Sequence, residues 1–203
     1  SDEAEKYSAA AFATKHEDAI YFSKRVTRAV PDGGPIEAHT DLVKKLDYEC
    51  ELAVVLGRDV RDVPAGQTRD YIFGYTILND VSARDVQTAH KQWYFGKSLD
   101  GFTPIGPCIV TADAFADYPP RLGIRSFVNG EKRQDSNTAL QIFDIDHVIS
   151  ELSQGMTLKA GTIIATGTPA GVGMGMDPPQ FLKPGVVVRC EIDGIGTLTN
   201  PVK

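Results

Sequence analysis

The sequence predicts a β-rich α+β fold in one domain. Short apolar runs that end at Gly, Pro, Asn or Asp recur along the chain and read as strands. They outnumber the two segments that carry clear helical signals, residues 81–93 and 144–155. Two dipeptides, Asn129-Gly130 and Asp193-Gly194, are typical of tight hairpin turns between strands. Because strands predominate and no internal repeat is visible, the class that this pattern favours is α+β.

The composition is that of an ordinary globular protein and argues against several functions. The chain has 203 residues, of which 42% are hydrophobic and 24% are charged. Its net charge of −6 argues against binding to nucleic acid or to an acidic membrane, and no apolar run approaches the roughly 20 residues of a membrane span. Three widely spaced cysteines, Cys50, Cys108 and Cys190, indicate buried thiols in a reducing compartment. Since the start of the chain does not read as a signal peptide, a cytoplasmic protein is expected.

The N-terminal part carries the weakest structural signals. Residues 1–20 include one run that could form a short helix, 8–14, but no clear periodicity. We therefore expect a mobile N-terminal segment over 1–20 and a single domain over residues 21–203. A Pro-Asp-Gly-Gly-Pro cluster at residues 31–35 predicts a turn, and the first long strand is expected after it.

Residues 47–57 read as that strand, because five apolar residues run up to a glycine. Side chains alternate along a strand, so Glu49 and Glu51 point to one face, roughly 6–7 Å apart at Cα. Two neighbouring carboxylates in partly desolvated surroundings are unfavourable unless a cation neutralises them. The alternative is a solvated face of an edge strand. The Ala-Val-Val-Leu run at residues 53–56 is apolar on both faces and favours burial and a metal.

The elements that follow are read from the same signals. Residues 71–78 are expected to form a buried strand that ends at Asn79-Asp80, and residues 81–93 a helix. Five Gly or Pro residues within 95–107 predict a loop, a common place for functional residues. Asp144 is suited to cap the second helix. Further strands are expected at residues 108–111, 124–128, 131–134, 162–166, 186–192 and 196–198.

Asp80 would complete a set of three carboxylates with Glu49 and Glu51. It ends a buried strand just before the expected helix, where its side chain can be fixed, although capping that helix is an alternative role. Neither His nor Cys has ligand-like spacing near these acids, so the set points to Mg²⁺ or Mn²⁺, or Ca²⁺, and away from zinc. Arg84 and Gln87 lie four and seven residues after Asp80, on one face of the expected helix, and would form a clamp for a substrate carboxylate. The alternative is a simple Asp80–Arg84 ion pair.

Two further features could bind an anion. Lys97 lies in the Gly/Pro-rich loop, where its ammonium could meet developing negative charge, although most loop lysines are solvated. Residues 167–173 are rich in glycine and can present backbone N–H groups to an anion. The segment lacks both the Lys-Ser/Thr ending of a P-loop and the spacing of a dinucleotide fingerprint, so nucleotide binding is disfavoured. His147 is read as an ordinary surface residue.

Four separated motifs resemble those of the fumarylacetoacetate hydrolase family, in the same order. They are Tyr48-Glu49-Cys50-Glu51-Leu52, the run from Asn79 to Gln87, Gly96-Lys97-Ser98 and Thr166-Gly167-Thr168-Pro169. The match spans roughly residues 20–200. The resemblance implies a mixed β-roll of the type found in the C-terminal domain of this family, a homodimer, and a divalent metal.

The resemblance also implies which residues form the site. The metal ligands would be Glu49, Glu51 and Asp80. The substrate contacts would be Lys24, Arg84, Gln87, Lys97 and Thr168, with Arg84 and Lys97 also catalytic. Lys24 is taken from Phe22-Ser23-Lys24, which resembles a Phe-x-Lys motif, although Arg25 stands where a proline often follows.

One departure concerns the catalytic base. Hydrolytic members of the family place a His and a Glu, three residues apart, on an N-terminal lid helix that activates water. Here the expected positions after Tyr7 hold alanines, and the nearby candidates are the adjacent His16 and Glu17, which would point in different directions on a helix. Either the lid is shortened to a remnant or absent from the sequence as given, or the reaction needs no such base.

The resulting hypothesis is a metal-dependent enzyme that cleaves a C–C bond in small 2-oxo acids through an enolate. Hydrolysis of an acylpyruvate ranks first, on the commonest activity of the family. Decarboxylation of oxaloacetate and isomerisation of 2-hydroxyhepta-2,4-diene-1,7-dioate at the same site are the alternatives. An alternative of another class is a non-catalytic metal-binding structural protein.

Overall fold

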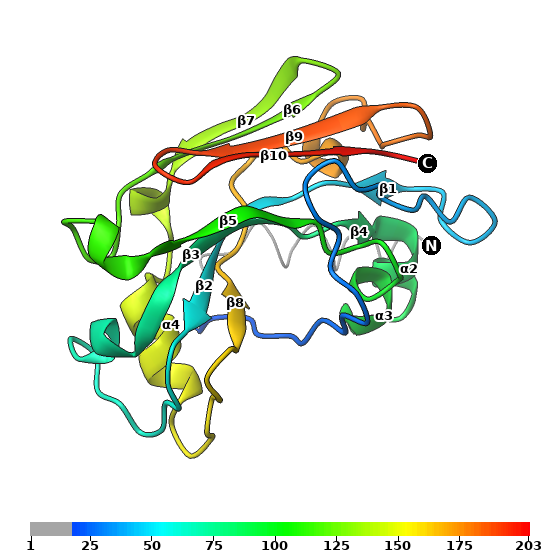
Figure 1. Cartoon of the computed structure of the whole chain (residues 1–203). Helices are drawn as coiled ribbons and strands as arrows, with labels where there is room; N and C mark the ends of the chain where they lie inside the picture. The colour runs from blue at the N-terminus through cyan, green and yellow to red at the C-terminus, as the bar shows by residue number, and fades with distance from the viewer. Residues whose placement is uncertain (1–17) are drawn as a thin grey trace.

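The computed structural model describes residues 18–203, and two antiparallel four-stranded sheets dominate it (Figure 1). One sheet has the order β10-β9-β6-β7 and the other β5-β3-β2-β8, while β1 and β4 form a short two-stranded pair. The helix expected at residues 8–14, and residues 1–17 of the segment expected to be mobile, lie outside the described residues. The strands are Leu46–Asp47 (β1), Cys50–Leu56 (β2), Ile72–Asn79 (β3), Ser82–Ala83 (β4), Ile105–Thr111 (β5), Gly123–Val128 (β6), Glu131–Asn137 (β7), Ile163–Ala165 (β8), Val187–Ile192 (β9) and Gly196–Pro201 (β10).

Helices are short and lie at the ends of the sheets (Figure 1). They are Arg84–Ala89 (α2), Tyr94–Lys97 (α3) and Ile145–Leu152 (α4), with 3₁₀ turns at Thr68–Tyr71 (η1), Ala112–Ala114 (η2), Thr138–Leu140 (η3) and Gly173–Gly175 (η4). The predicted β-rich α+β class is therefore confirmed. Two isolated parallel bridges, Val30 with Pro104 and Ile36 with Val202, accompany the antiparallel ladders. Within residues 18–203, no helix is both long and apolar enough to cross a membrane.

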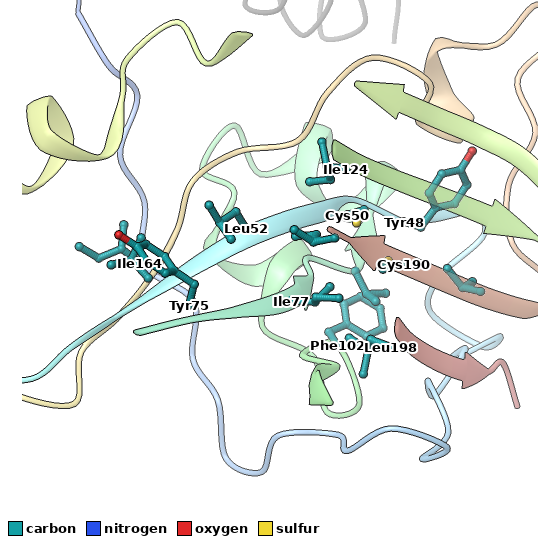
Figure 2. Close-up of a cluster of buried hydrophobic side chains, with 14 of the residues drawn as sticks. Tyr48, Cys50, Leu52, Tyr75, Ile77, Phe102, Ile124, Ile164, Cys190 and Leu198 are labelled. Carbon is teal, nitrogen blue, oxygen red and sulfur yellow. The ribbon is translucent and has the colours of Figure 1, made fainter. Parts of the chain in front are cut away.

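The core lies between the two sheets, and alternate residues of β2 point into it. Cys50 and Leu52 face Ile124, Cys190 and Leu198 of the other sheet, and all five are buried (Figure 2). Each fully buried aliphatic side chain contributes roughly 1.5–3 kcal/mol through its removal from water. This packing fixes which face of β2 is apolar, so the acids must point to the opposite face.

The acid-bearing strand is an interior strand, so the alternative of a solvated edge strand is wrong. β2 pairs with β3 on one side and β8 on the other, and every residue from Cys50 to Leu56 is buried. Its pairing with β3 runs from Leu56–Ile72 to Cys50–Asn79, which brings the end of β3 beside the start of β2. The backbone N–H of Asp80 donates to the carbonyl of Glu49 over 2.8 Å. The antiparallel register thus places the third carboxylate next to the first.

The helix predicted over residues 81–93 is wrong in its extent. Residues 82–83 form β4, which pairs with β1 through Leu46–Ala83 and Asp47–Ser82, so the helix begins only at Arg84. It ends at Ala89, and Lys91 has a φ of 59°, in the left-handed region that breaks a helix. The segment predicted as a loop, residues 95–107, contains most of the helical turn α3 and the first residues of β5. At residues 82–83, strand pairing with β1 has overridden local helix propensity.

Several local predictions are confirmed. Asn129 and Gly130 have φ of 49° and 83° and join β6 to β7, as a hairpin turn requires. The Asp144 carboxylate accepts the backbone N–H of His147 over 2.8 Å and caps α4. Cys50 and Cys190 are buried thiols, but Cys108 is exposed, contrary to prediction, because β5 is the edge of its sheet.

Candidate active site

The structure brings the three predicted carboxylates together. One oxygen from each of Glu49, Glu51 and Asp80 lies within 4.8 Å of the others, and the residues are 7%, 3% and 3% exposed. Glu51 lies on the face of β2 opposite the core, Glu49 directly precedes β2, and Asp80 follows β3. Three oxygen donors at this separation match the preference of hard divalent cations such as Mg²⁺, Mn²⁺ and Ca²⁺.

Two lysines contact these carboxylates. Lys97 Nζ lies 2.8 Å from Glu49 Oε2 and 2.6 Å from Asp80 Oδ2, and Lys24 Nζ lies 2.5 Å from Asp80 Oδ1. Lys97 is 2% exposed at the end of α3, so its sequence alternative as a solvated loop lysine is wrong. Burial alone would lower the pKa of Lys97, but Glu49 and Asp80 outweigh it and raise the pKa above its ordinary value. Burial lowers the pKa of Lys24 more than Asp80 raises it.

The acids respond to the same contacts. Burial alone would raise the pKa of Glu49, but Lys97 and Arg84 hold it below its ordinary value. Burial would likewise raise the pKa of Asp80, and Lys24 and Lys97 hold it down. Both groups therefore stay ionised at neutral pH. Their partners are ammonium and guanidinium groups, the kind of charge that a metal ion could also supply.

Glu51 differs from the other two acids. Its Oε2 accepts the backbone N–H of Gly167 over 2.8 Å, but among the described residues no Lys, Arg or His forms a salt bridge with it. Burial, followed by the charges of Asp80 and Glu49, raises its pKa well above its ordinary value. A buried carboxylate without a cation is the group that a divalent ion would stabilise most. The residues present therefore fit a metal site formed by these three acids.

Arg84 lies beside the cluster but not in the predicted pair. Its Nη1 lies 2.6 Å from Glu49 Oε1 and 3.2 Å from Gln87 Oε1, so Gln87 is brought to the site with it. The Asp80–Arg84 ion pair is wrong, because Arg84 Nε instead contacts Asp47 Oδ2 over 2.9 Å. Asp80 lies outside α2, so the predicted shared helix face is also wrong. Ala83 is the N-cap of α2, without a side-chain hydrogen bond, so Asp80 does not cap this helix.

Thr168 follows Gly167, whose backbone N–H contacts Glu51. Its hydroxyl donates to the carbonyl of Cys50 over 3.0 Å and accepts from Gln134 Nε2 over 2.8 Å. Because these partners already occupy the hydroxyl, they orient the residue within the loop that follows β8. The structure thus groups all the predicted metal ligands with Lys24, Arg84, Gln87 and Lys97, while Thr168 adjoins them through the Gly167 contact.

Sequence reasoning missed two buried residues that hold this site. Asp47 is 0% exposed and contacts Arg84, and Gln134 is 0% exposed and accepts the backbone N–H of Cys50 over 3.1 Å. Asp47 could have been noticed, because it is a third acid at the start of the strand expected over residues 47–57, two positions before Glu49. Gln134 carries no such signal, because its neighbours Arg133 and Asp135 are polar as well.

The two candidates for the catalytic base are not among the described residues. His16 and Glu17 fall outside the described residues, so their role stays a prediction. The three histidines within residues 18–203 contact other parts of the chain: His39 the carbonyl of Asp100, His90 the ring of Phe95, and His147 the carboxylate of Glu151. His147 is about half exposed, as expected for a surface residue.

Comparison with known proteins agrees with the motifs. The family model described as fumarylacetoacetate (FAA) hydrolase C-terminal matches residues 2–203. The chain belongs to the fumarylacetoacetate hydrolase family. Oxaloacetate tautomerase YisK of Bacillus subtilis is 45% identical over 186 residues, which cover 92% of this chain and 62% of that protein. An uncharacterised Staphylococcus epidermidis member is 47% identical over 184 residues, 90% of this chain and 61% of its own length.

Solved structures of the family have the same fold. The fumarylacetoacetate hydrolase of Exiguobacterium antarcticum superposes with a TM-score of 0.90 at 48% identity, over 94% of this chain and 68% of that one. A 2-hydroxyhepta-2,4-diene-1,7-dioate isomerase of Mycobacterium marinum gives 0.81 at 43% identity, over 91% and 69%. The chain spans about three-fifths of the length of the curated relatives it matches. The family members similar to it include enzymes named as hydrolase, isomerase and tautomerase.

Proposed function

We propose that this cluster is the active site of a divalent-metal-dependent enzyme acting on small 2-oxo acids through an enolate, and that keto–enol isomerisation is its reaction. The observation that supports it best is Glu51, a buried carboxylate beside Glu49 and Asp80 that forms no salt bridge with a Lys, Arg or His of residues 18–203. The three acids would hold Mg²⁺ or Mn²⁺, with Ca²⁺ as the alternative. A bound divalent cation acts as a Lewis acid toward negative charge that develops on a 2-oxo oxygen.

Charge balance supports an anionic substrate. The ionic groups at the site are the partly exposed Lys24 and six buried residues, Asp47, Glu49, Glu51, Asp80, Arg84 and Lys97. With a divalent cation bound, which would keep Glu51 ionised, four carboxylates, three cationic side chains and the ion would give one net positive charge. In a desolvated site an anionic substrate is then favoured over a neutral one. A carboxylate next to a 2-oxo group has this charge.

The chain's own residues would bind the substrate and handle its charge. Arg84, held beside Glu49 and Gln87, would bind the substrate carboxylate through its planar guanidinium. Lys97 stays an ammonium because two carboxylates contact it, so it would offset the negative charge of the enolate. Isomerisation also needs a group that exchanges a proton with carbon. Lys24, whose Nζ lies 2.5 Å from Asp80 Oδ1 and whose side chain is 12% exposed, is our candidate for this group.

Isomerisation is ranked above hydrolysis because of what each reaction requires, and above decarboxylation because of the named activities of similar proteins. Hydrolysis of an acylpyruvate needs a group that activates water in addition to the enolate site. The sequence candidates for that group, His16 and Glu17, are untested, so hydrolysis stays a prediction, as does decarboxylation of oxaloacetate. The similarity to a named oxaloacetate tautomerase and a named dienedioate isomerase also supports the isomerisation reading. The homodimer and the cytoplasmic location likewise remain predictions.

The test follows the loss of enol oxaloacetate by its ultraviolet absorbance, with Mn²⁺ or with EDTA, against the rate without enzyme. Glu51→Gln keeps the shape of the side chain but removes its charge. We expect it to lower metal-dependent turnover by more than about 100-fold, since loss of an outer-shell partner alone can cost 10–100-fold. Glu37→Gln, at a half-exposed glutamate away from the cluster, is the matched control and should match the wild type.

Two results would contradict the proposal in different ways. Full activity of Glu51→Gln in EDTA would show that neither the metal nor this acid is needed. Absence of metal-dependent turnover of oxaloacetate, an acylpyruvate and a dienedioate by the wild type would favour a non-catalytic metal-binding protein.

A further inference from the structure

Asp47 is a fully buried carboxylate to which no metal-binding or substrate-binding role has been given so far. It is the last residue of β1 and is 0% exposed. Its oxygens contact Arg84 and the backbone of the loop that contains η4. A charged group that is fully buried needs partners, and its choice of partners indicates what it organises.

Both oxygens of Asp47 are saturated with hydrogen bonds. Oδ1 accepts the backbone N–H groups of Tyr48 over 2.9 Å and Gly173 over 2.7 Å. Oδ2 accepts the backbone N–H of Met174 over 3.0 Å and Arg84 Nε over 2.9 Å. With two donors on each oxygen, Asp47 has little capacity left for a metal ion or a substrate. Its role must therefore act through the groups it holds.

The contact with Arg84 determines how the guanidinium is oriented. Asp47 holds Nε, while Glu49 and Gln87 hold Nη1, over 2.6 Å and 3.2 Å. Because a guanidinium is planar, fixing two of its nitrogens fixes its plane. Among the described residues, Nη2 is the guanidinium nitrogen of Arg84 without a partner, and the direction in which it donates depends on that plane. The partner of Nε therefore influences substrate binding without touching the substrate.

The other contacts join Asp47 to the glycine-rich loop. A Cβ on Gly173 would lie 2.8 Å from Asp47 Oδ1 and 2.1 Å from the carbonyl of Gln180, so only glycine allows this close approach. The same loop begins at Gly167, whose N–H contacts Glu51. Asp47 thus holds the loop on one side and Arg84 on the other.

We propose that Asp47 is a positioning residue. It orients Arg84 toward the substrate carboxylate and fixes the position of the 167–175 loop relative to Arg84. The inference rests on the proposed function, since it concerns how that site binds a 2-oxo acid. It predicts that losing the Asp47 charge weakens substrate binding more than it slows the chemical step.

The test is a double-mutant cycle of Asp47→Asn and Arg84→Lys, with KM and kcat measured in the Mn²⁺-dependent oxaloacetate assay. We expect Asp47→Asn to raise KM on the order of tenfold to a hundredfold, the range for loss of one charge-assisted hydrogen bond, with a smaller change in kcat. Arg84→Lys should raise KM as well, and the double variant should be no worse than the more severe single variant, because both changes break one interaction.

The matched control is Asp146→Asn. Asp146 also accepts a backbone N–H and a side-chain donor, from Gly66 over 2.5 Å and Thr68 over 2.6 Å, but at α4. It should lower the melting temperature without changing KM. The proposal is overturned if Asp47→Asn changes KM no more than Asp146→Asn does, or if the Asp47 and Arg84 effects multiply in the double variant.

A second measurement does not depend on how the Asp47 variant folds. In the wild type, the Arg84 Nε–H, assigned by its loss in Arg84→Lys, should give a slowly exchanging ¹H–¹⁵N signal, because a buried carboxylate accepts it. Rapid exchange would overturn the proposal. The two proposals also fail separately: no metal-dependent turnover by the wild type counts against the proposed function, whereas turnover with an Arg84-dependent but Asp47-independent KM counts against this inference alone.

Discussion

At the residue scale, the site is a compact group of buried charges that are stable only together. Lys97 contacts two carboxylates within 2.8 Å. The mutual attraction and hydrogen bonds of these three groups offset the free-energy cost of their desolvation. Such a group adds little net stability compared with an apolar core, but removing one member leaves an uncompensated charge. The arrangement therefore specifies geometry more than it stabilises the fold.

This reasoning predicts the effect of Lys97→Met. The change leaves Glu49 and Asp80 with one cation fewer in a buried site, so we expect a loss of about 3–5 kcal/mol in the free energy of unfolding, measured by urea denaturation in EDTA. Lys159→Met, which breaks the exposed pair of Lys159 with Asp59, is the control and should change stability little. Equal, small losses in both variants would show that Lys97 is not an obligate partner of these acids.

At the element scale, strand pairing rather than helix propensity decides where the side chains of the candidate site lie. β1 pairs with β4 and keeps residues 82–83 extended, so α2 starts at Arg84 and points this residue toward Asp47 and Glu49. The position of α4, by contrast, depends on local sequence. Its start is set locally, by the Asp144 cap, and its apolar residues Ile145 and Ile149 pack into the core.

The cap gives a prediction at this scale. Asp144→Ala removes the acceptor for the backbone N–H of His147 and should lower the free energy of unfolding by about 1 kcal/mol, measured by thermal or urea denaturation. Asp113→Ala, at an exposed aspartate in η2, is the matched control. Unchanged stability in Asp144→Ala would mean that α4 is held by its core contacts alone.

At the scale of the whole molecule, the proposed metal binding would be coupled to folding, because the three acids meet only when β2 and β3 are paired. A ligand that binds only the folded state stabilises it by mass action. Mn²⁺ at about 100 times its Kd should add about 2.7 kcal/mol. For a chain of this size, that raises the melting temperature by roughly 5–10 °C.

Differential scanning calorimetry with and without Mn²⁺ measures this shift. Glu51→Gln should reduce it strongly, and Glu37→Gln should keep it. If Glu51→Gln shows the same shift as the wild type, the ion binds elsewhere on the chain.

The sequence by itself determined the β-rich class, the hairpin turn at Asn129-Gly130, the cap at Asp144 and the three-carboxylate set. These depend on period-two alternation, on turn chemistry and on capping, which act between residues close in the chain. The acids could be grouped because Glu49 and Glu51 alternate with apolar neighbours, and because Asp80 ends the next buried strand just before an expected helix.

Only the tertiary structure decided which charges pair. Lys97 is buried because α3 packs it against Glu49 and Asp80, Arg84 meets Asp47 because β1 and β4 pair, and Gln134 reaches β2 from the opposite sheet. These contacts join residues from 17 to 84 positions apart, so local pattern carries no information about them. Burial then sets their strength, since a charge in a desolvated site must find a partner.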